Sequence, residues 1–368
     1  MFEKLNIKKL NYKASELLKN PQKGFIPALT AGSQNQGLNC YVPKSEATIL
    51  KNVISLSANG DGIAFFQSGE FTILQDAYAI DFICKPNKIS NNHYLFIVGA
   101  INKIIGKYNW NNKSGWNRVK DDKIKLPIKD ENLGDDLENI DFKFMEDFIA
   151  ELEAQRIAEL EAYLITTNLK DYNLTTDEKQ ALKDFENLEW QEFKTTKIFD
   201  IKNTFNILSR DIIKNSGTIP YLCASAENNG VNTYIDYDEN FKDKGNCIFI
   251  GGKTFVVSYQ KTDFFSNDSH NLTLRLKNQI ITKENQLFLA SCVNKSLSYK
   301  YSWGNSVSNS KIKKEFINLP IKNGEINYKF MQNFIKAIEK LVIKDVVDFA
   351  DEKISLTKKC IKTPCETK

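Results

Sequence analysis

The chain has 368 residues, of which 42% are hydrophobic and 26% charged, and its formal net charge is +4; this composition is typical of folded globular domains and excludes a largely disordered chain. No apolar run approaches the roughly 20 residues of a membrane span, and the first five residues lack the apolar core of a signal peptide, so no membrane partner is expected. The seven cysteines show no paired spacing, which predicts reduced thiols and a cytoplasmic protein.

The first third of the chain has the pattern of short strands followed by a helix. Residues 52–57, 63–67 and 79–83 are apolar runs bounded by turn residues, which predicts strands. The Asn-Gly and Asp-Gly pairs between residues 58 and 62 predict a turn between the first two strands. Residues 94–105 have the length and composition of a helix.

Two long helices are predicted, at residues 137–166 and 326–350. In both, apolar side chains recur at spacings of three and four residues. The helices could pair as an antiparallel coiled coil, or each could pack on its own half of the chain. We favour pairing, because both apolar stripes continue past what one small module would cover. The residues expected in the seam are Phe148, Leu152, Leu160, Phe334, Ile338 and Leu341.

The second half repeats the alternation of connector, strands and helix. Residues 167–189 form a polar connector with a short helix at 176–187, for which Thr175 offers a cap. Residues 246–250, 255–259 and 272–276 predict strands. The last residues, 351–368, form a polar tail that we expect to fray.

A shift of 193 positions aligns the two halves of the chain. The sequence Leu-Pro-Ile-Lys at residues 126–129 repeats identically at 319–322, and residues 35–37 align with Asn228-Asn229-Gly230. Further pairs in register are Gln67 with Gln260, Phe71 with Phe264 and Trp110 with Trp303. The chain is therefore a tandem duplication of one module, and the period is far too long for a solenoid repeat.

The duplication predicts an α+β fold with two mixed α/β domains separated by two long helices that pair as an antiparallel coiled coil. The expected boundaries are 1–136 for the first domain, 137–166 for the first long helix, 167–189 for the connector, 190–325 for the second domain, 326–350 for the second long helix and 351–368 for the tail.

Charge is unevenly distributed along each module. Residues 101–129 contain eight Lys or Arg against two Asp, and residues 300–322 contain five Lys against one Glu. Residues 141–161 invert this balance, with seven acidic residues against two basic ones. A basic segment that also carries Tyr and Trp is typical of a nucleic-acid surface, although a solvated lysine-rich face has the same pattern.

Motifs of catalysis and of cofactor binding are absent from the sequence. It contains no phosphate-binding glycine loop, no Gly-x-Gly-x-x-Gly, no Cys-x-x-Cys and no Gly-x-Ser-x-Gly. The two histidines, His93 and His270, occupy different places in the two modules and do not predict a shared metal pair. We therefore expect a chain that binds rather than catalyses, with no cofactor and no metal.

The order of module, long helix, module, long helix resembles the specificity subunit of type I restriction–modification systems and the separate specificity subunits of some type II systems. Residues 190–193, Trp-Gln-Glu-Phe, are similar to the opening of their target recognition domains, residues 219–231 to the first turn, and residues 303–321 to the closing segment. The first module carries the same marks at residues 26–37 and 124–127, but the Trp-x-x-Phe opening is not evident there. Two alternatives are that residues 2–10 stand in for it or that the N-terminus is shortened.

The resemblance implies a non-catalytic subunit in which each domain reads one half of a bipartite site in double-stranded DNA. The long helices would set the spacing and dock DNA methyltransferase subunits, and the assembly would recruit a restriction endonuclease subunit. The acidic residues 141–161 suit protein docking, because they would repel phosphate. Two alternatives are the recognition portion of a fused restriction–modification enzyme and a tandem carbohydrate- or protein-binding module.

Candidates for DNA contact follow from residue type, since Lys and Arg neutralise phosphates while Asn, Gln, Arg and Lys read base edges. A structural role competes for the repeated residues: we expect 35–37 and 228–230 to form the same turn, and Trp110 and Trp303 to lie in the core. The candidates are Gln34, Asn35, Gln36, Asn59, Asp61, Lys107, Lys113, Arg118, Lys120, Asn228, Asn229, Lys253, Thr254, Lys300, Lys311 and Lys313.

Overall fold

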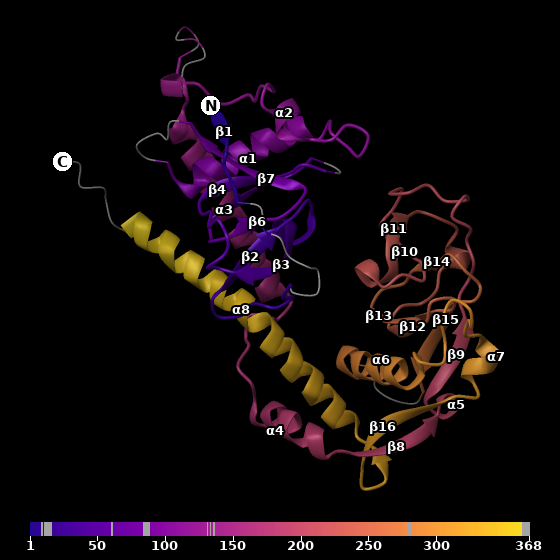
Figure 1. The fold of residues 1–368 in the computed structure, drawn as a ribbon. Coiled ribbons are helices and arrows are strands. Elements are labelled where there is room, and N and C mark those ends of the chain that lie inside the picture. Colours follow the sequence, from indigo (N-terminus) through magenta and orange to yellow (C-terminus); the bar gives the residue numbers. More distant parts are fainter. Residues whose placement is uncertain are drawn as a thin grey trace. The chain divides into compact units, whose positions relative to one another are not determined.

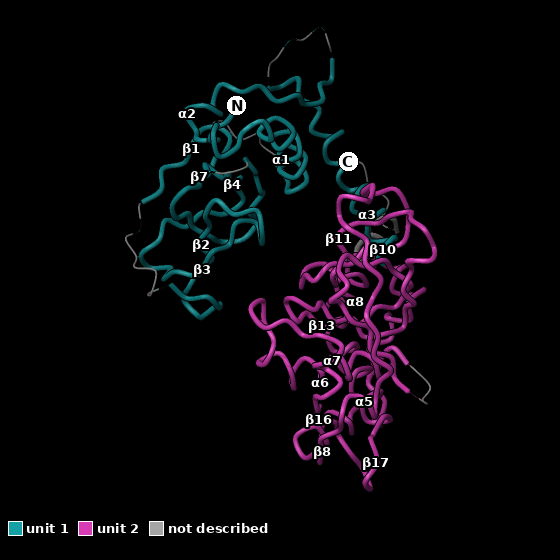
Figure 2. The backbone as a smooth tube through the Cα atoms, turned by 90° about the vertical axis from the view of Figure 1, so that its right-hand side faces the viewer, with its two compact units in different colours: residues 1–160, 360–368 teal, residues 161–359 magenta. Residues whose placement is uncertain are grey.

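The computed structural model describes residues 1–8, 10, 17–59, 62–83, 89–130, 132, 134, 137–277 and 282–362 (Figure 1). The chain divides into two compact units, one built on residues 1–160 and one on residues 161–359 (Figure 2). The division falls inside the first long helix, so the end of that helix belongs to the second unit. None of the described helices is both long enough and apolar enough to cross a membrane.

The first module consists of two small sheets and a helix. The larger sheet is antiparallel and has the order β1 (Phe2–Lys4), β7 (Ala77–Phe82), β4 (Val53–Ser57) and β5 (Ala64–Gln67). The smaller sheet joins β3 (Leu38–Pro43), β2 (Phe25–Leu29) and β6 (Thr72–Ile73). The helix α1 (Asn91–Ile105) follows β7. These elements confirm the strands predicted at 52–57, 63–67 and 79–83 and the helix predicted at 94–105.

The core of this module lies between α1 and the larger sheet. Ile54 and Ile80 from the strands and Ile97 and Ile101 from the helix are all buried in one cluster. Burying each such side chain contributes about 1.5–3 kcal/mol. The side chain of Asn102 also ties α1 to the edge strand β5, because it accepts a hydrogen bond from the Ala64 N–H (2.7 Å) and donates one to the Ala64 carbonyl (3.0 Å).

The second module repeats this architecture, which confirms the duplication. Its larger sheet has the order β13 (Val256–Gln260), β12 (Cys247–Gly251), β15 (Leu272–Leu276) and β9 (Phe199–Asn203). Its smaller sheet joins β11 (Val231–Ile235), β10 (Ile219–Leu222) and β14 (Phe265–Ser266), and α6 (Lys283–Leu297) takes the place of α1. The strands predicted at 246–250, 255–259 and 272–276 are confirmed.

A third sheet is present in the second module. It joins β17 (Glu325–Ile326), β16 (Phe316–Lys322) and β8 (Glu189–Lys194), so the opening and closing segments of the module pair with each other. In the first module, β1 pairs with β7 as β9 pairs with β15. Residues 2–4 therefore correspond to β9, and the expectation that residues 2–10 replace the Trp-x-x-Phe strand is wrong for those residues.

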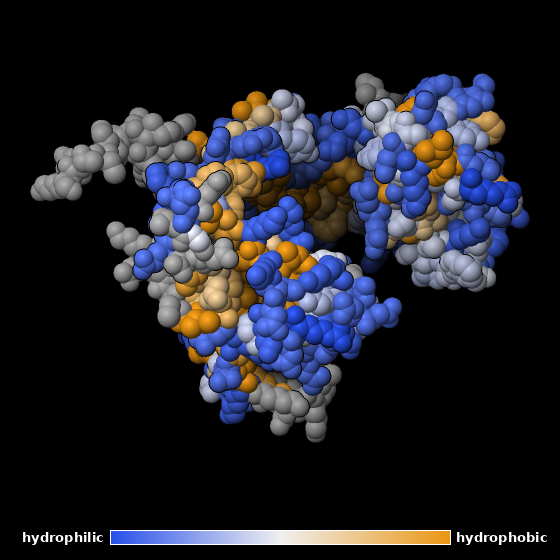
Figure 3. Space-filling view, turned by 90° about the horizontal axis from the view of Figure 1, so that it is seen from above, coloured by the Kyte–Doolittle hydropathy of each residue, from blue (hydrophilic) through white to orange (hydrophobic). Residues whose placement is uncertain are grey.

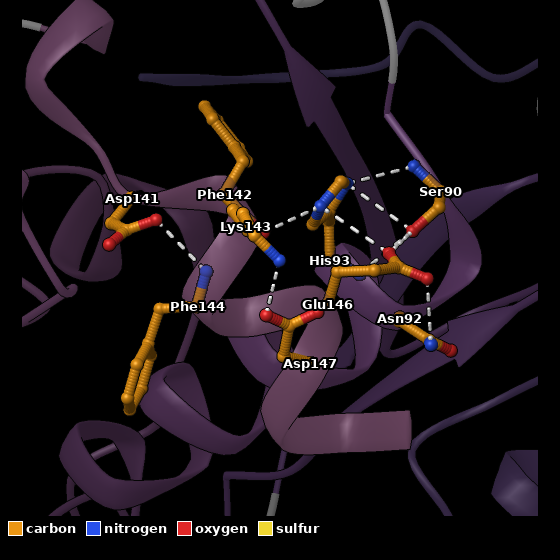
Figure 4. A network of polar contacts seen from close by, with 9 residues as sticks. All are labelled: Ser90, Asn92, His93, Asp141, Phe142, Lys143, Phe144, Glu146 and Asp147. Carbon is orange, nitrogen blue, oxygen red and sulfur yellow. Dashed lines mark hydrogen bonds and ion pairs between the residues drawn. The ribbon is translucent and has the colours of Figure 1, made fainter. Parts of the chain in front are cut away.

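The first long helix, α3 (Phe142–Thr166), is anchored to the start of α1 by polar contacts (Figure 4). Glu146 accepts hydrogen bonds from the Ser90 hydroxyl and from Asn92 Nδ2 (2.9 Å). The His93 ring bridges the two helices, because Nδ1 accepts from the Ser90 N–H (2.9 Å) while Nε2 lies 2.9 Å from the Phe142 carbonyl oxygen. These contacts fix the first turns of α3 against their own module.

The second long helix, α8 (Tyr328–Lys362), is longer than predicted. The expectation of an end near residue 350 and a frayed tail is wrong for residues 351–362, which continue the helix. The physical reason is that residues 325–363 contain no Gly or Pro, so polar character alone does not terminate the helix. Lys170 of the connector also approaches Asp351 Oδ1 at 3.3 Å.

The connector is held on α8 by one buried ion pair. It contains α4 (Thr176–Asp184), which Thr175 caps, and the short 3-10 turn η5 (Phe185–Asn187). Together these two elements confirm the helix predicted at residues 176–187. The Lys340 ammonium donates to Glu178 Oε2 (2.9 Å) and to the Asn173 carbonyl (2.8 Å). Burial raises the pKa of the Glu178 carboxyl, but the Thr175 backbone N–H and Lys340 outweigh it, and that pKa lies below its ordinary value.

We expect Lys340→Ala to lower the free energy of unfolding of the second unit by about 2–3 kcal/mol, because it leaves the buried Glu178 carboxylate without its cation. Thermal melting checks this. Lys344→Ala, one turn further along α8, is the matched control, since the Lys344 pair with Asp348 is exposed and loose at 3.9 Å. Equal melting temperatures for the two variants would contradict the assignment.

Candidate nucleic-acid interface

The repeated turn at residues 35–37 and 228–230 has the same unusual backbone in both modules. Asn35 and Asn228 both have φ of 47°, and the glycines that follow have φ of 84° at Gly37 and 82° at Gly230. This left-handed conformation favours Gly and Asn, which explains the repeated sequence. The expectation that both segments form one kind of turn is confirmed.

A glutamine from the adjacent strand holds each turn. Gln67 Nε2 donates to the Gln36 carbonyl (3.3 Å), and Gln260 Nε2 donates to the Asn229 carbonyl (2.9 Å). The side chain of Asn229 returns a bond to the Tyr259 carbonyl (3.0 Å). The side chains of Gln34, Asn35 and Gln36 are exposed, so the turn presents amides to solvent from a rigid backbone.

The loop that follows the central strand pairs with an aspartate in each module. Asn59 Nδ2 donates to Asp76, and Lys253 Nζ lies 2.6 Å from Asp268 Oδ2. Burial raises the pKa of the Asp268 carboxyl, but Lys253 and His270 outweigh it, so that pKa lies below its ordinary value. Corresponding loops thus carry an amide–carboxylate pair in one module and an ion pair in the other.

The two repeated tryptophans lie on the surface, so the expectation that they belong to the core is wrong. Trp110 is 69% exposed and Trp303 is 79% exposed. Each lies in a tight loop, closed by bridges between Asn109 and Asn112 and between Ser302 and Asn305. Their repetition preserves the loop and an exposed aromatic ring rather than a packing contact. An exposed ring beside polar loops can stack on a base or contact a sugar.

The fold brings these segments together in the second module. Thr254 Oγ1 donates to the carbonyl of Ala224, at the start of the left-handed turn (2.9 Å). The Val307 N–H donates to the Gly252 carbonyl (3.0 Å), which links the same loop to the Trp303 loop. Three segments that are far apart in the sequence therefore form one continuous surface.

The first module has the corresponding arrangement around a surface groove. The groove is lined by Ala31, which precedes the turn, and by Asn59, Asp76 and Trp110. Ser114 Oγ donates to the Ser57 carbonyl (2.7 Å), so the Trp110 loop is again fixed beside the loop after the central strand. Asp61, the remaining candidate in this loop, lies outside the described residues.

Several of the predicted lysines have a structural partner. Lys107 lies 2.6 Å from Asp122, and Lys300 lies 2.6 Å from Glu315, and both carboxylates also accept from a neighbouring tyrosine hydroxyl. These carboxylates raise the pKa of the two lysines. Their repetition is explained by this contact, and a contact with DNA stays a prediction.

The other basic candidates differ in how they are held. Lys311 donates to Asn305 Oδ1 (2.9 Å) and Arg118 to Asn112 Oδ1 (2.5 Å), so both brace a tryptophan loop. Lys113, Lys120 and Lys313 are exposed. Lys120 lines a separate groove with Trp116, away from the groove that contains Trp110. Figure 3 shows one face of the molecule, where hydrophilic side chains are interspersed with apolar ones.

The residues predicted to form the helix seam have mixed surroundings. The Phe148 ring packs edge-on against Phe96 of α1 at 5.6 Å, and Phe334 packs against Phe288 of α6 at 5.9 Å. These two contacts match the alternative in which each helix packs on its own module. Leu152, Ile338 and Leu341 are exposed and Leu160 is half-buried. Pairing of the helices stays a prediction.

Among the described residues, no group of three or more His, Cys, Asp or Glu is placed to hold a metal ion. The arrangement instead offers amides, ammonium groups and exposed aromatic rings on rigid loops. These are the groups that contact phosphates and base edges in nucleic-acid interfaces. The site is therefore suited to recognition.

Comparison with known proteins agrees with this geometry. Residues 1–162 and 187–348 each match the type I restriction modification DNA specificity domain. The specificity subunit S.BcgI of a type II restriction enzyme from Heyndrickxia coagulans is 26% identical over 267 residues, which cover 71% of this chain and 71% of that protein. The type I restriction–modification S subunit from M. genitalium has the same fold, with a TM-score of 0.54 and 13% identity over 97% of this chain and 93% of that one.

The two matched segments together span most of the sequence, one in each module. The chain belongs to the family of restriction–modification DNA specificity proteins. Its role is that of a specificity subunit, which recognises DNA and does not carry the catalytic centre. The predicted resemblance is confirmed, and so is the two-domain α+β architecture.

The left-handed turn gives a direct test of the geometry. We expect Gly230→Ala to destabilise the chain by about 1–2 kcal/mol, because φ is 82° there and a Cβ would lie 3.2 Å from the Cys223 carbonyl oxygen. Gly304→Ala is the matched control, since no atom lies within 4 Å of its Cβ position. Chemical denaturation of both variants measures the difference, and an unchanged Gly230→Ala midpoint would show that the turn is not constrained.

Proposed function

We propose that each module reads one half of a bipartite site in double-stranded DNA, through the surface formed by the left-handed turn, the loop after the central strand and the tryptophan loop. The observation that carries this proposal is the divergence of side chains on a repeated backbone. The loop after the central strand holds Asn59 paired with Asp76 in one module, and the corresponding loop holds Lys253 paired with Asp268 in the other. Two copies of one scaffold with different polar groups suit two different half-sites.

The chemistry of these groups supports base and phosphate recognition. An amide such as Asn59 can read a base edge, and its hydrogen bond to Asp76 orients it. The Lys253 side chain is 52% exposed despite its ion pair, so its ammonium can reach a phosphate or a guanine. The exposed Trp110 and Trp303 rings add apolar contact next to these polar groups.

We further propose that α3 and α8 pair in the assembled protein, set the distance between the half-sites and dock DNA methyltransferase subunits, with a restriction endonuclease subunit recruited to the complex in the cytoplasm. The acidic character of residues 141–161 supports protein docking over DNA contact. The similarity to a type II and to a type I specificity subunit supports these partners. Catalysis would belong to the partner subunits.

The recognition portion of a fused enzyme remains the second candidate, and the duplicated family domain supports it equally. A generic binding module is distinguished by salt. Binding to DNA through several Lys and Arg weakens with a slope of about −0.9 per phosphate contacted in a plot of log K against log salt. A carbohydrate ligand would show no such slope.

We expect changes in one module to alter one half-site only. Lys253→Gln combined with Thr254→Ala should reduce discrimination against wrong base pairs at one half-site by about 1–3 kcal/mol per base pair, which is tenfold or more in affinity. Lys113→Gln should reduce discrimination at the other half-site. Binding to a DNA library with randomised half-sites and spacers measures both effects. Lys179→Gln, which removes an exposed charge from α4, is the control. Equal loss at both half-sites would exclude two independent readers.

Pairing of the long helices predicts a loss of stability or of partner binding when the seam is charged. Leu152→Asp and Ile338→Asp should each lower the melting temperature and the affinity for the methyltransferase, because a carboxylate would be buried in an apolar seam. Ala158→Asp places the same charge at an exposed position of α3 and is the control. Wild-type melting temperature and wild-type methyltransferase binding in both variants would show that the helices do not pair.

A further inference from the structure

The two modules differ in one large element. In the second module, the continuous segment from α4 through η5 to β8 covers one side of the domain. No described segment of residues 1–160 has this position in the first module. Because the two modules are copies of one another, the second shows what the uncovered side of the first is shaped to receive.

In the second module, the closing strand β16 is fully covered by β8. Six residue pairs join the two strands, from Phe316 with Lys194 to Ile321 with Glu189. The pairing satisfies backbone groups of β16 along the β8 side. The side chains of Ile317 and Leu319 are 0% exposed and belong to the core cluster that includes α6.

The same segment also covers an aromatic cluster. The Phe185 ring stacks on Phe334 of α8 at 4.7 Å, and the Trp190 ring stacks on Phe288 of α6 at 6.4 Å. The third member of this cluster, Phe330, is only 6% exposed. Two aromatic side chains five residues apart thus anchor the covering segment on the helices.

The corresponding closing segment of the first module bridges from Ile128 to Ile140, as Ile321 pairs with Ile326, but on its other side no described residue takes the place of β8. Ile124 and Leu126 correspond to Ile317 and Leu319 but are only partly buried, and Ile128 is 45% exposed. The backbone N–H groups of residues 124–126 make no hydrogen bond within the described part of the chain. These residues line a groove together with Trp116.

The aromatic cluster of the first module is likewise uncovered. Phe96, Phe144 and Phe148 correspond to Phe288, Phe330 and Phe334, and they contact one another in the same way. Phe144 is 49% exposed and Phe148 is 47% exposed, in contrast to Phe330. In Figure 4 the Phe144 ring points away from the polar contacts that join α3 to α1.

We propose that this side of the first module, which we call the uncovered edge (residues 124–128 with Phe96, Phe144 and Phe148), docks an extended segment of a partner protein that adds a strand to residues 124–128. The segment carries aromatic residues in place of Phe185 and Trp190, and acidic residues. This inference rests on the comparison of the two modules and is independent of the proposed reading of DNA.

Charge supports an acidic occupant. Lys120, Lys123 and Lys125 line the groove together with one carboxylate, Asp122, which is paired with Lys107. Lys125 takes the place of Asn318, which lies opposite Glu192 in the second module. The covering strand β8 itself contains two glutamates, Glu189 and Glu192. An acidic strand would therefore meet a more basic edge in the first module than β8 meets in the second.

The chain's own segments suit this edge less well. Residues 351–368 contain five lysines and no aromatic residue, so they offer neither anchors nor complementary charge. The β8 segment of a second copy is already paired with its own β16 and would have to be released. A partner protein with an unpaired segment of acidic and aromatic residues would supply the anchors and the charge, and no existing strand pairing would have to be broken.

The test uses the full chain and a fluorescent peptide with the sequence of residues 176–198. We expect saturable binding by fluorescence anisotropy, at least tenfold weaker with Phe144→Ala and several-fold weaker with Lys125→Glu. Trp110→Ala and Lys103→Glu are the matched controls, since they remove an exposed aromatic ring and reverse an exposed charge away from the groove. A peptide with Phe185→Ala and Trp190→Ala should not bind.

A second measurement avoids dependence on the affinity of a short peptide. A copy of residues 176–198 fused directly before Phe2 should slow hydrogen exchange of the residue 124–128 amides and raise the melting temperature, because β1 occupies the place of β9. Unchanged exchange, or peptide binding that Phe144→Ala leaves intact, would overturn the proposal. Self-association of the wild-type chain that Lys125→Glu abolishes would also overturn it, because the occupant would then be a second copy.

Discussion

The packing of one helix on one antiparallel sheet, α1 in the first module and α6 in the second, is the constraint on which the rest of each module depends. It buries the apolar faces of both elements and leaves the loops after the central strands outside the core. Hydrogen bonds from the buried Gln260 and Ser114 and from the exposed Thr254 then fix these loops against one another. A rigid polar surface is thereby built on segments that contribute little to the core.

Duplication separates the framework from the readable surface. The residues that repeat in register, such as Gln67 and Gln260 or Gly37 and Gly230, hold the backbone of the turn. The residues that differ, such as Asn59 and Lys253, present their polar atoms beside an aspartate in corresponding loops. One backbone can thus support two specificities, because a change of side chain there leaves the buried contacts intact.

The same sequence also has different surroundings in the two modules. Leu-Pro-Ile-Lys at residues 319–322 belongs largely to a three-stranded sheet, whereas its copy at 126–129 borders a groove. The difference arises from the neighbouring segment and not from the four residues themselves, since a strand needs a partner to satisfy its backbone. The repeated segment is therefore accessible in the first module, whereas in the second module β8 occupies the same side of it.

The sequence by itself determined the duplication, the α+β class, most strands and both long helices, because hydrophobic periodicity and residue identity are local properties. It also predicted that residues 35–37 and 228–230 form the same turn, whereas the positive φ of that turn comes from the structure. Only the tertiary structure decided that Trp110 and Trp303 are exposed, that Lys107 and Lys300 are paired with carboxylates, and that α8 continues to Lys362. Repetition shows that a residue matters but not which contact it makes, because burial and pairing depend on segments distant in the sequence.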